Sequence, residues 1–341
     1  MKALACTKST AALTNGSIQS FMEQMPQFLK VHTDKSVVYL PAATGTGFSR
    51  INYLEEGLSI RNLDFSLKED FEFLRLARKK GEEKTFQLYY FLESINFHFS
   101  LNDSEELLSP ATFSNILLVS NDFQIRGRFE KDETVKVVII SFSSSWLRKN
   151  CFDTTGTGKS LLTEGEERDK GVLMMQYPDM EDHNTAASIN QMHIPGNNFP
   201  FPIKANCLKL IERFFEAIEK RQHINLKESN TEHFLQMLKV EKFICKHLLT
   251  NLPVIKELSK LFLMSESNLK KHFRIVYGKN IYEYYLEKKM SLAREMLLKD
   301  NNTISKVAYS MGYEKVASFS KAFKKMYHIL PSQLKSQQLT P

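Results

Sequence analysis

Two segments near the C-terminal end of the chain repeat one pattern of apolar and polar positions. Residues 253–273 read PVIKELSKLFLMSESNLKKHF, and residues 303–323 read TISKVAYSMGYEKVASFSKAF. In each segment apolar residues recur at helical spacing, a short break follows, and a second helix carries basic residues on its outer face. This order is typical of a helix-turn-helix, a DNA-binding unit. A plain helical hairpin is the alternative for either copy alone, and the presence of two copies disfavours it.

The first copy predicts which side chains are buried and which face solvent. Its first helix is expected to bury Ile255, Leu258 and Leu261. Leu263 and Met264 are expected to fill the turn, and Ser265 to cap the second helix. The second helix should bury Leu269, Phe273 and Val276. Its outer face then consists of Ser267, Asn268, Lys270, Lys271 and Arg274.

The second copy follows the same plan. Thr303 is expected to cap its first helix, and Gly312 to permit the sharp turn. Val316 to Tyr327 form the expected second helix, with Phe319 and Phe323 inward. Its outer face carries Ala317, Ser318, Lys321, Lys324 and Lys325. Between the copies, Asn280 can cap a long connecting helix with apolar residues on two sides, which predicts a helix packed against both units.

Short aromatic or β-branched runs fill the chain from about residue 37 to residue 147, and several alternate apolar with polar positions. Such runs predict an antiparallel β-sandwich or barrel. Residues 150–202 favour loops with one or two short helices, and helical spacing begins at Leu208 and continues to Ile218. The apolar face of this helix has two interpretations, self-association or packing onto its own sheet. The polar segment 221–230 is the expected domain boundary.

The charge of the chain is concentrated at its C-terminal end. From Thr231 onward there are 19 Lys and Arg against 9 Asp and Glu, a net of +10. The chain totals of 46 and 39 leave 27 basic and 30 acidic residues before Thr231, a net of −3. A basic module joined to a nearly neutral one suits a polyanion partner such as DNA.

Enzymatic, metal and membrane signals are weak. The segment TTGTGKS at 154–160 ends like a phosphate-binding loop, but Asp153 stands where the first glycine is needed. The four cysteines are far apart, so we expect reduced thiols, with neither a disulfide nor a zinc site. No run approaches the length of a membrane span, and the N-terminal residues lack a secretory signal. We therefore expect a cytoplasmic protein with no catalytic residues, no metal site and no cofactor.

The C-terminal segment resembles the AraC/XylS family of bacterial transcription regulators. The likeness rests on LSKLF and LMSESNLKKHF, on YGKNIYEYYLEKKMSLAREMLL, on ISKVAYSMGYEKVASFSKAFKK and on LPSQL. The family implies two helix-turn-helix subdomains bridged by a long helix, with base-reading residues early in each second helix. By motif position these are Ser267, Lys270, Lys271, Val316, Ala317, Ser318 and Lys321. Tyr313 replaces a common phenylalanine, and His328 replaces a glycine, which puts the final helix stop in doubt.

These observations predict an α+β protein with a β-rich N-terminal regulatory domain over 1–205. A helical linker that could dimerise spans 206–230, and an all-α double helix-turn-helix domain spans 231–341. The expected partners are double-stranded promoter DNA, RNA polymerase, an unknown small-molecule effector and a second copy of the chain, with no membrane. The alternative is a sensor or adaptor that uses the basic domain to contact a protein or a membrane surface. Such a surface would expose Phe273, Phe319 and Phe323, whereas a helix-turn-helix buries them.

Overall fold

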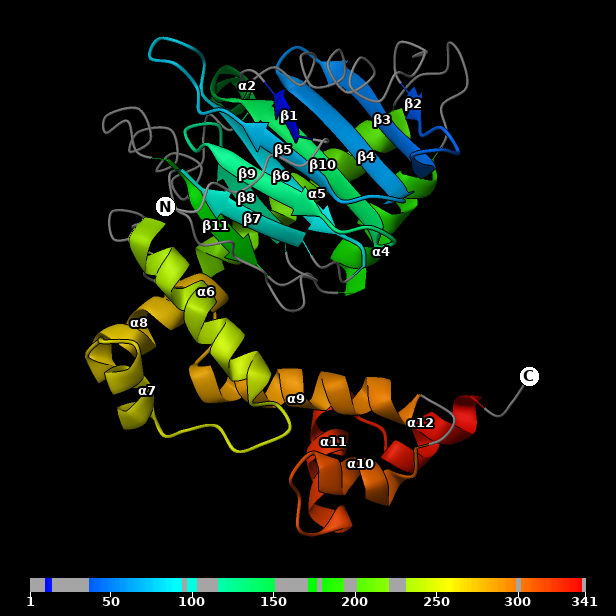
Figure 1. The fold of residues 1–341 in the computed structure, drawn as a ribbon, viewed down its shortest axis with the longest axis vertical. Coiled ribbons are helices and arrows are strands. Elements are labelled where there is room, and N and C mark those ends of the chain that lie inside the picture. Colours follow the sequence, from blue (N-terminus) through cyan, green and yellow to red (C-terminus); the bar gives the residue numbers. More distant parts are fainter. Residues whose placement is uncertain are drawn as a thin grey trace. The chain divides into compact units, whose positions relative to one another are not determined.

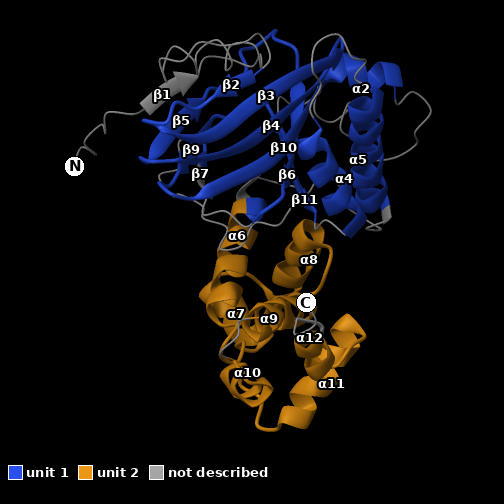
Figure 2. Ribbon diagram, turned by 90° about the vertical axis from the view of Figure 1, so that its right-hand side faces the viewer, with its two compact units in different colours: residues 1–234 blue, residues 235–341 orange. Residues whose placement is uncertain are grey.

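The computed structural model divides the chain into two compact units, Met1–Phe234 and Leu235–Pro341, called unit 1 and unit 2 below (Figure 2). It describes residues 10–13, 37–93, 97–102, 116–150, 171–176, 180–192, 201–220, 231–298 and 302–338. The expected boundary segment 221–230 and the TTGTGKS segment 154–160 lie outside the described residues. None of the helices in the described ranges combines the length and the apolar character that a membrane span requires.

Unit 1 is built on two β-sheets (Figure 1). The larger sheet has the strand order β11-β8-β6-β10-β4-β3-β2, and every pairing in it is antiparallel. Its strands are β2 (Val37–Tyr39), β3 (Gly45–Glu55), β4 (Leu58–Leu67), β6 (Thr85–Phe91), β8 (Ile116–Ser120), β10 (Thr134–Ser143) and β11 (Leu173–Gln176). The smaller sheet has the order β1-β5-β9-β7, with β1 parallel to β5. Its strands are β1 (Thr10–Leu13), β5 (Phe71–Arg75), β7 (Phe97–Leu101) and β9 (Ile125–Phe129).

Helices cover one face of the larger sheet. They are α2 (Ser144–Asn150), α4 (Met180–Gln191) and α5 (Phe201–Lys220). Alternate residues of β4, β6 and β10, such as Ile60, Leu88 and Ile140, form one buried cluster with the inner face of α5. The hydroxyl of Tyr90 also donates to the carbonyl oxygen of Leu210 at 2.8 Å. The apolar face of α5 therefore packs onto its own sheet, the second of the two interpretations.

Helix α5 begins at Phe201, earlier than the sequence pattern predicted. Ile203 and Cys207 continue the buried row of Leu210 toward the N-terminus, so the same face is used along the whole helix. A cysteine and an isolated isoleucine are a weak periodic signal, and the preceding segment is rich in proline, which hid this start.

The opposite face of the larger sheet packs on the smaller sheet. Phe65 of β4 meets Phe129 of β9 edge-on, with ring centroids 5.5 Å apart. Arg75 of β5 reaches across to β6 and β8, where it donates to the side-chain oxygen of Gln87 and the carbonyl oxygen of Ser120. The predicted β-rich sandwich or barrel is confirmed as two facing sheets, and the parallel pairing of β1 with β5 departs from the antiparallel arrangement that was predicted.

Unit 2 is wholly helical in its described part (Figure 1). Its helices are α6 (Thr231–Lys246, which begins in unit 1), α7 (Ile255–Leu261), α8 (Glu266–Tyr277), α9 (Ile281–Leu297), α10 (Ile304–Ser310), α11 (Val316–Tyr327) and α12 (Pro331–Gln338). Helix α9 has apolar contacts toward both ends. Near its start Tyr284 packs on Phe273 of α8, and near its end Ala293 and Leu297 join a cluster with Phe319 and Phe323 of α11.

Candidate nucleic-acid interface

Helices α7 and α8 form the first helix-turn-helix. Leu258, Leu269 and Phe273 are almost fully buried, as predicted. The hydroxyl of Ser265 accepts a hydrogen bond from the backbone N–H of Asn268 at 3.2 Å, so the predicted cap of α8 is confirmed.

The turn between these helices differs from the prediction. Leu263 was expected to fill the turn, but its side chain is 92% exposed. Its backbone has a φ of 53°, in the left-handed region, and this directs the side chain away from the core. Leu261 is also exposed, because the short helix α7 turns only Leu258 and Ser259 fully inward. The predictions that Leu261 is buried and that Leu263 fills the turn were therefore wrong.

Helices α10 and α11 form the second helix-turn-helix. Thr303 accepts from the backbone N–H of Lys306 at 3.1 Å, and Gly312 has a φ of 74°, so the predicted cap and turn are confirmed. The ring of Tyr313 lies 5.6 Å from that of Phe319, in the place of the family's phenylalanine. His328 takes the left-handed position at the end of α11, with a φ of 60°. The helix stop is thus made without a glycine.

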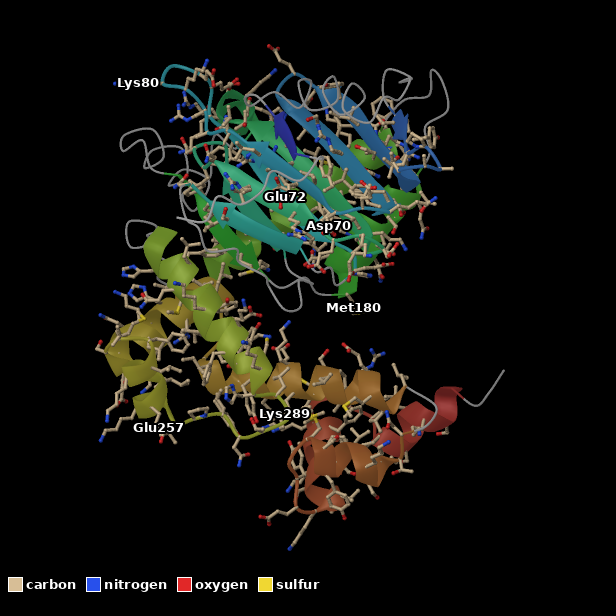
Figure 3. All side chains as sticks on the ribbon, viewed as in Figure 1. Asp70, Glu72, Lys80, Met180, Glu257 and Lys289 are labelled. Carbon is tan, nitrogen blue, oxygen red and sulfur yellow. The ribbon has the colours of Figure 1, made fainter. Side chains whose placement is uncertain are left out.

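The connecting helix α9 packs against both helix-turn-helix units. Asn280 caps it by accepting from the backbone N–H of Glu283 at 2.8 Å. Lys289 is buried in this helix, which the sequence pattern did not indicate (Figure 3). Its ammonium donates to the carbonyl oxygen of Thr250 at 3.1 Å and to the hydroxyl of Tyr285 at 2.5 Å. A buried lysine with these partners ties α9 to the loop between α6 and α7.

The side chains predicted on the outer faces of the two second helices are exposed. On α8 these residues are Ser267, Asn268, Lys270, Lys271 and Arg274. On α11 they are Ala317, Ser318, Lys321, Lys324 and Lys325. Val316 is half-buried and packs against the second core, so less of it is available to a ligand than the motif position suggested.

The charge on these two faces is almost entirely positive. Glu266 is the acidic residue of α8, and its carboxylate lies 4.0 Å from the ammonium of Lys270. An exposed pair of this kind contributes little free energy, so the lysine can exchange it for a phosphate at small cost. Helix α11 has no acidic residue. Each helix therefore presents a cationic face, and an α-helix is an element that the major groove of DNA can admit.

Lys315 extends the second face and was not among the predicted site residues. It is exposed and stands at the N-cap position of α11, with no side-chain cap hydrogen bond. The available signal was its place directly before the second helix, next to Val316. The N-terminal end of a helix favours anions, so an ammonium at this point can add to the attraction for a phosphate.

Comparison with known proteins supports this interpretation of unit 2. Residues 258–337 match a family model described as a helix-turn-helix domain. The chain is 27% identical over 123 residues to the probable transcriptional regulator LumQ of Photobacterium leiognathi, covering 36% of this chain and 49% of that protein. It is 29% identical over 120 residues to the Msm operon regulatory protein of Streptococcus mutans, covering 35% of this chain and 43% of that protein. The chain thus spans less than half the length of these curated relatives.

Among solved structures, the chain is similar to an apo form of ToxT from Vibrio cholerae. The TM-score is 0.34 and the sequence identity 16%, over 83% of this chain and 98% of that one.

Proposed function

We propose that this chain, whose residues 258–337 form an AraC-type helix-turn-helix domain, is a sequence-specific DNA-binding regulator of transcription. One observation carries the proposal. Two helix-turn-helix units stand on a single helix, α9, and each presents an exposed basic second helix. Such an arrangement suits two successive segments of major groove, since α9 sets the distance between the two reading helices.

The two helices differ in the contacts that they can make. On α8, Lys270, Lys271 and Ser267 can donate hydrogen bonds to base edges or phosphates. On α11, Ala317 offers only an apolar contact, which suits a thymine methyl group, while Lys324 and Lys325 suit phosphates. We therefore expect the first helix-turn-helix to recognise more bases through hydrogen bonds than the second helix-turn-helix does.

The alternative of a protein-binding or membrane-binding basic surface is disfavoured by the burial of three phenylalanines. Phe273, Phe319 and Phe323 are each 0% exposed. The aromatic anchors of a surface-binding helix have to be exposed. The three phenylalanines instead form part of the cores of the two helix-turn-helix units. We also propose that the chain acts by binding rather than by catalysis, as its regulator relatives suggest.

Unit 1 is proposed as the regulatory part, responding to a small-molecule effector. Promoter DNA, RNA polymerase and a second copy of the chain are the proposed macromolecular partners, in the cytoplasm. The core-facing side of α5 is occupied by its own sheet, so a dimer contact would have to use another surface.

Selection from a random DNA library with the full chain tests the proposal. We expect enrichment of a motif with two half-sites, and loss of about 1–3 kcal/mol of binding free energy in Lys271→Ala if that lysine contacts a base. Lys242→Ala is the matched control, because Lys242 is exposed on α6, outside both helix-turn-helix units. A library that emerges without any enriched sequence would contradict the proposal.

A further inference from the structure

The space between the two sheets of unit 1 contains a group of polar side chains. On the inner face of the larger sheet, Ser59 of β4, Ser141 of β10 and Gln87 of β6 lie side by side in one row of the strand register. Arg61 and Tyr89 lie in the next row, on either side of Ile139. Farther along the same strands the face becomes apolar. The polar group is therefore confined to these two rows of the face.

The smaller sheet adds a second guanidinium to this group. Arg75 of β5 donates to the side-chain oxygen of Gln87 and to the carbonyl oxygens of Ser120 and Phe123, at 3.1 and 3.4 Å for the last two. The hydroxyl of Tyr89 donates to the same oxygen of Gln87 at 2.6 Å. These bonds hold Arg75 and Tyr89 in place and use the acceptor capacity of Gln87.

Among the described residues, this group contains two cationic side chains, those of Arg61 and Arg75. Arg61 is 8% exposed, and burial lowers the pKa of its guanidinium to about 10. Among the described residues, the phenols of Tyr89 and Tyr53 act in the opposite direction and raise that pKa. Burial also lowers the pKa of Arg75, whose facing carboxylate is Asp122. A buried cation is costly unless an anion faces it.

Asp122 is already shared with other cations. Its two oxygens lie 2.5 Å from Nε of Arg78 and 2.8 Å from the ammonium of Lys84. It also accepts from the hydroxyl of Ser120 at 2.6 Å. One carboxylate thus serves three cations, Arg75 included, and little of its charge remains for the inter-sheet group.

Hydrogen-bonding capacity in this group is also unused. Among the residues that the structure describes, the hydroxyl of Ser141 and Nε of Arg75 are buried with no hydrogen-bond partner. Ser141 is 6% exposed, so its hydroxyl is largely shielded from solvent. Buried polar atoms are nearly always paired, and exceptions require an explanation.

We infer that the Arg61, Arg75 and Ser141 group binds the oxyanion of a small molecule, a carboxylate or a phosphate. Two guanidinium groups and a hydroxyl supply the charge and the donors that such an oxyanion requires. The inference rests on the proposed function in one respect, that the bound anion is the effector of the regulator. It gives that effector a chemical class, namely an acid rather than a neutral sugar or a cation.

Thermal unfolding of the full chain tests the site without DNA. Sodium acetate, benzoate and phosphate are each titrated against sodium chloride at constant ionic strength. We expect at least one of these oxyanions to raise the melting temperature of unit 1 in proportion to the logarithm of its concentration. In Arg61→Met, the anion concentration that gives half of the rise in melting temperature should be at least tenfold higher than in wild type. Arg126→Met is the matched control, since Arg126 is exposed on β9 and its loss removes the same charge from the same unit.

Ser141→Ala is a second, milder variant for the case that Arg61→Met does not fold. It removes only a hydroxyl group. It should weaken the response to the same anion several-fold and leave the melting temperature in chloride nearly unchanged. A wild-type protein that none of the three anions stabilises beyond chloride overturns the inference, as does an undiminished response in Arg61→Met and Ser141→Ala. Either result leaves DNA recognition by unit 2 intact, and a failed DNA selection leaves an anion response of unit 1 intact.

Discussion

At the scale of single residues, Leu263 occupies a position that suits glycine or asparagine. Its φ of 53° is costly for a leucine, and with 92% of the side chain exposed it gains little burial in return. In the second helix-turn-helix, Gly312 stands at the corresponding place in the turn. We predict that Leu263→Asn raises the free energy of unfolding of unit 2 by about 0.5–1 kcal/mol, because asparagine tolerates left-handed backbone. Chemical denaturation of the variant and of wild type measures this difference in the free energy of unfolding.

Leu261→Asn is the control for this change, because Leu261 is 55% exposed but lies within α7. It should lower stability slightly, since asparagine is a weaker helix former than leucine. Equal effects of the two substitutions would show that hydrophobicity, rather than backbone strain, decides the outcome at Leu263.

At the scale of elements, α6 is held to α9 by a buried carboxylate. Glu241 is 2% exposed and accepts from the hydroxyl of Tyr284 at 2.7 Å. Burial raises the pKa of Glu241, while Tyr284, Lys288 and Cys245 lower it in part. The folded state therefore keeps the proton to higher pH than the unfolded state does. The contribution of Glu241 to the free energy of unfolding should be greatest below its unfolded pKa of about 4.3. This contribution should fall as the pH rises toward the pKa of the folded state.

Glu241→Gln should remove this contribution to the pH dependence. The amide oxygen can still accept from Tyr284, and no charge is buried, so we predict a gain on the order of 1 kcal/mol at pH 7. Denaturation of the variant and of wild type from pH 4 to pH 8 measures the difference. Glu257→Gln, at an exposed position of α7, serves as the matched control. A variant that is less stable than wild type at pH 7 would refute the interpretation.

At the scale of the whole molecule, the basic charge belongs to the C-terminal residues. A fragment of residues 231–341 carries a net charge of +10, against −3 for the rest. We predict that this fragment binds DNA by itself, with log K falling against log salt by about 0.9 for each phosphate contacted. A gel-shift series between about 50 and 200 mM salt measures the slope. Replacing Lys321, Lys324 and Lys325 by alanine should make the slope shallower, and an unchanged slope would place the phosphate contacts elsewhere.

The repeated helical pattern could be predicted because its signals are local. Caps at Ser265, Asn280 and Thr303 act through hydrogen bonds to backbone only a few residues away, and each is present in the structure. Apolar spacing likewise identified Phe273 and Phe323 as core residues. Such features depend on three- and four-residue intervals that any isolated stretch of chain already contains.

Local sequence patterns were enough to predict the two helix-turn-helix units, the connecting helix, the strand-rich first half and the division of charge. They did not show that Leu263 faces solvent, that Lys289 and Glu241 are buried, or that Arg61 and Arg75 lie between two sheets. The physical reason is distance along the chain. Periodicity shows that a residue has an inward face, but the partner on that face comes from a remote strand or helix, and the free energy of burying a charge depends on that partner.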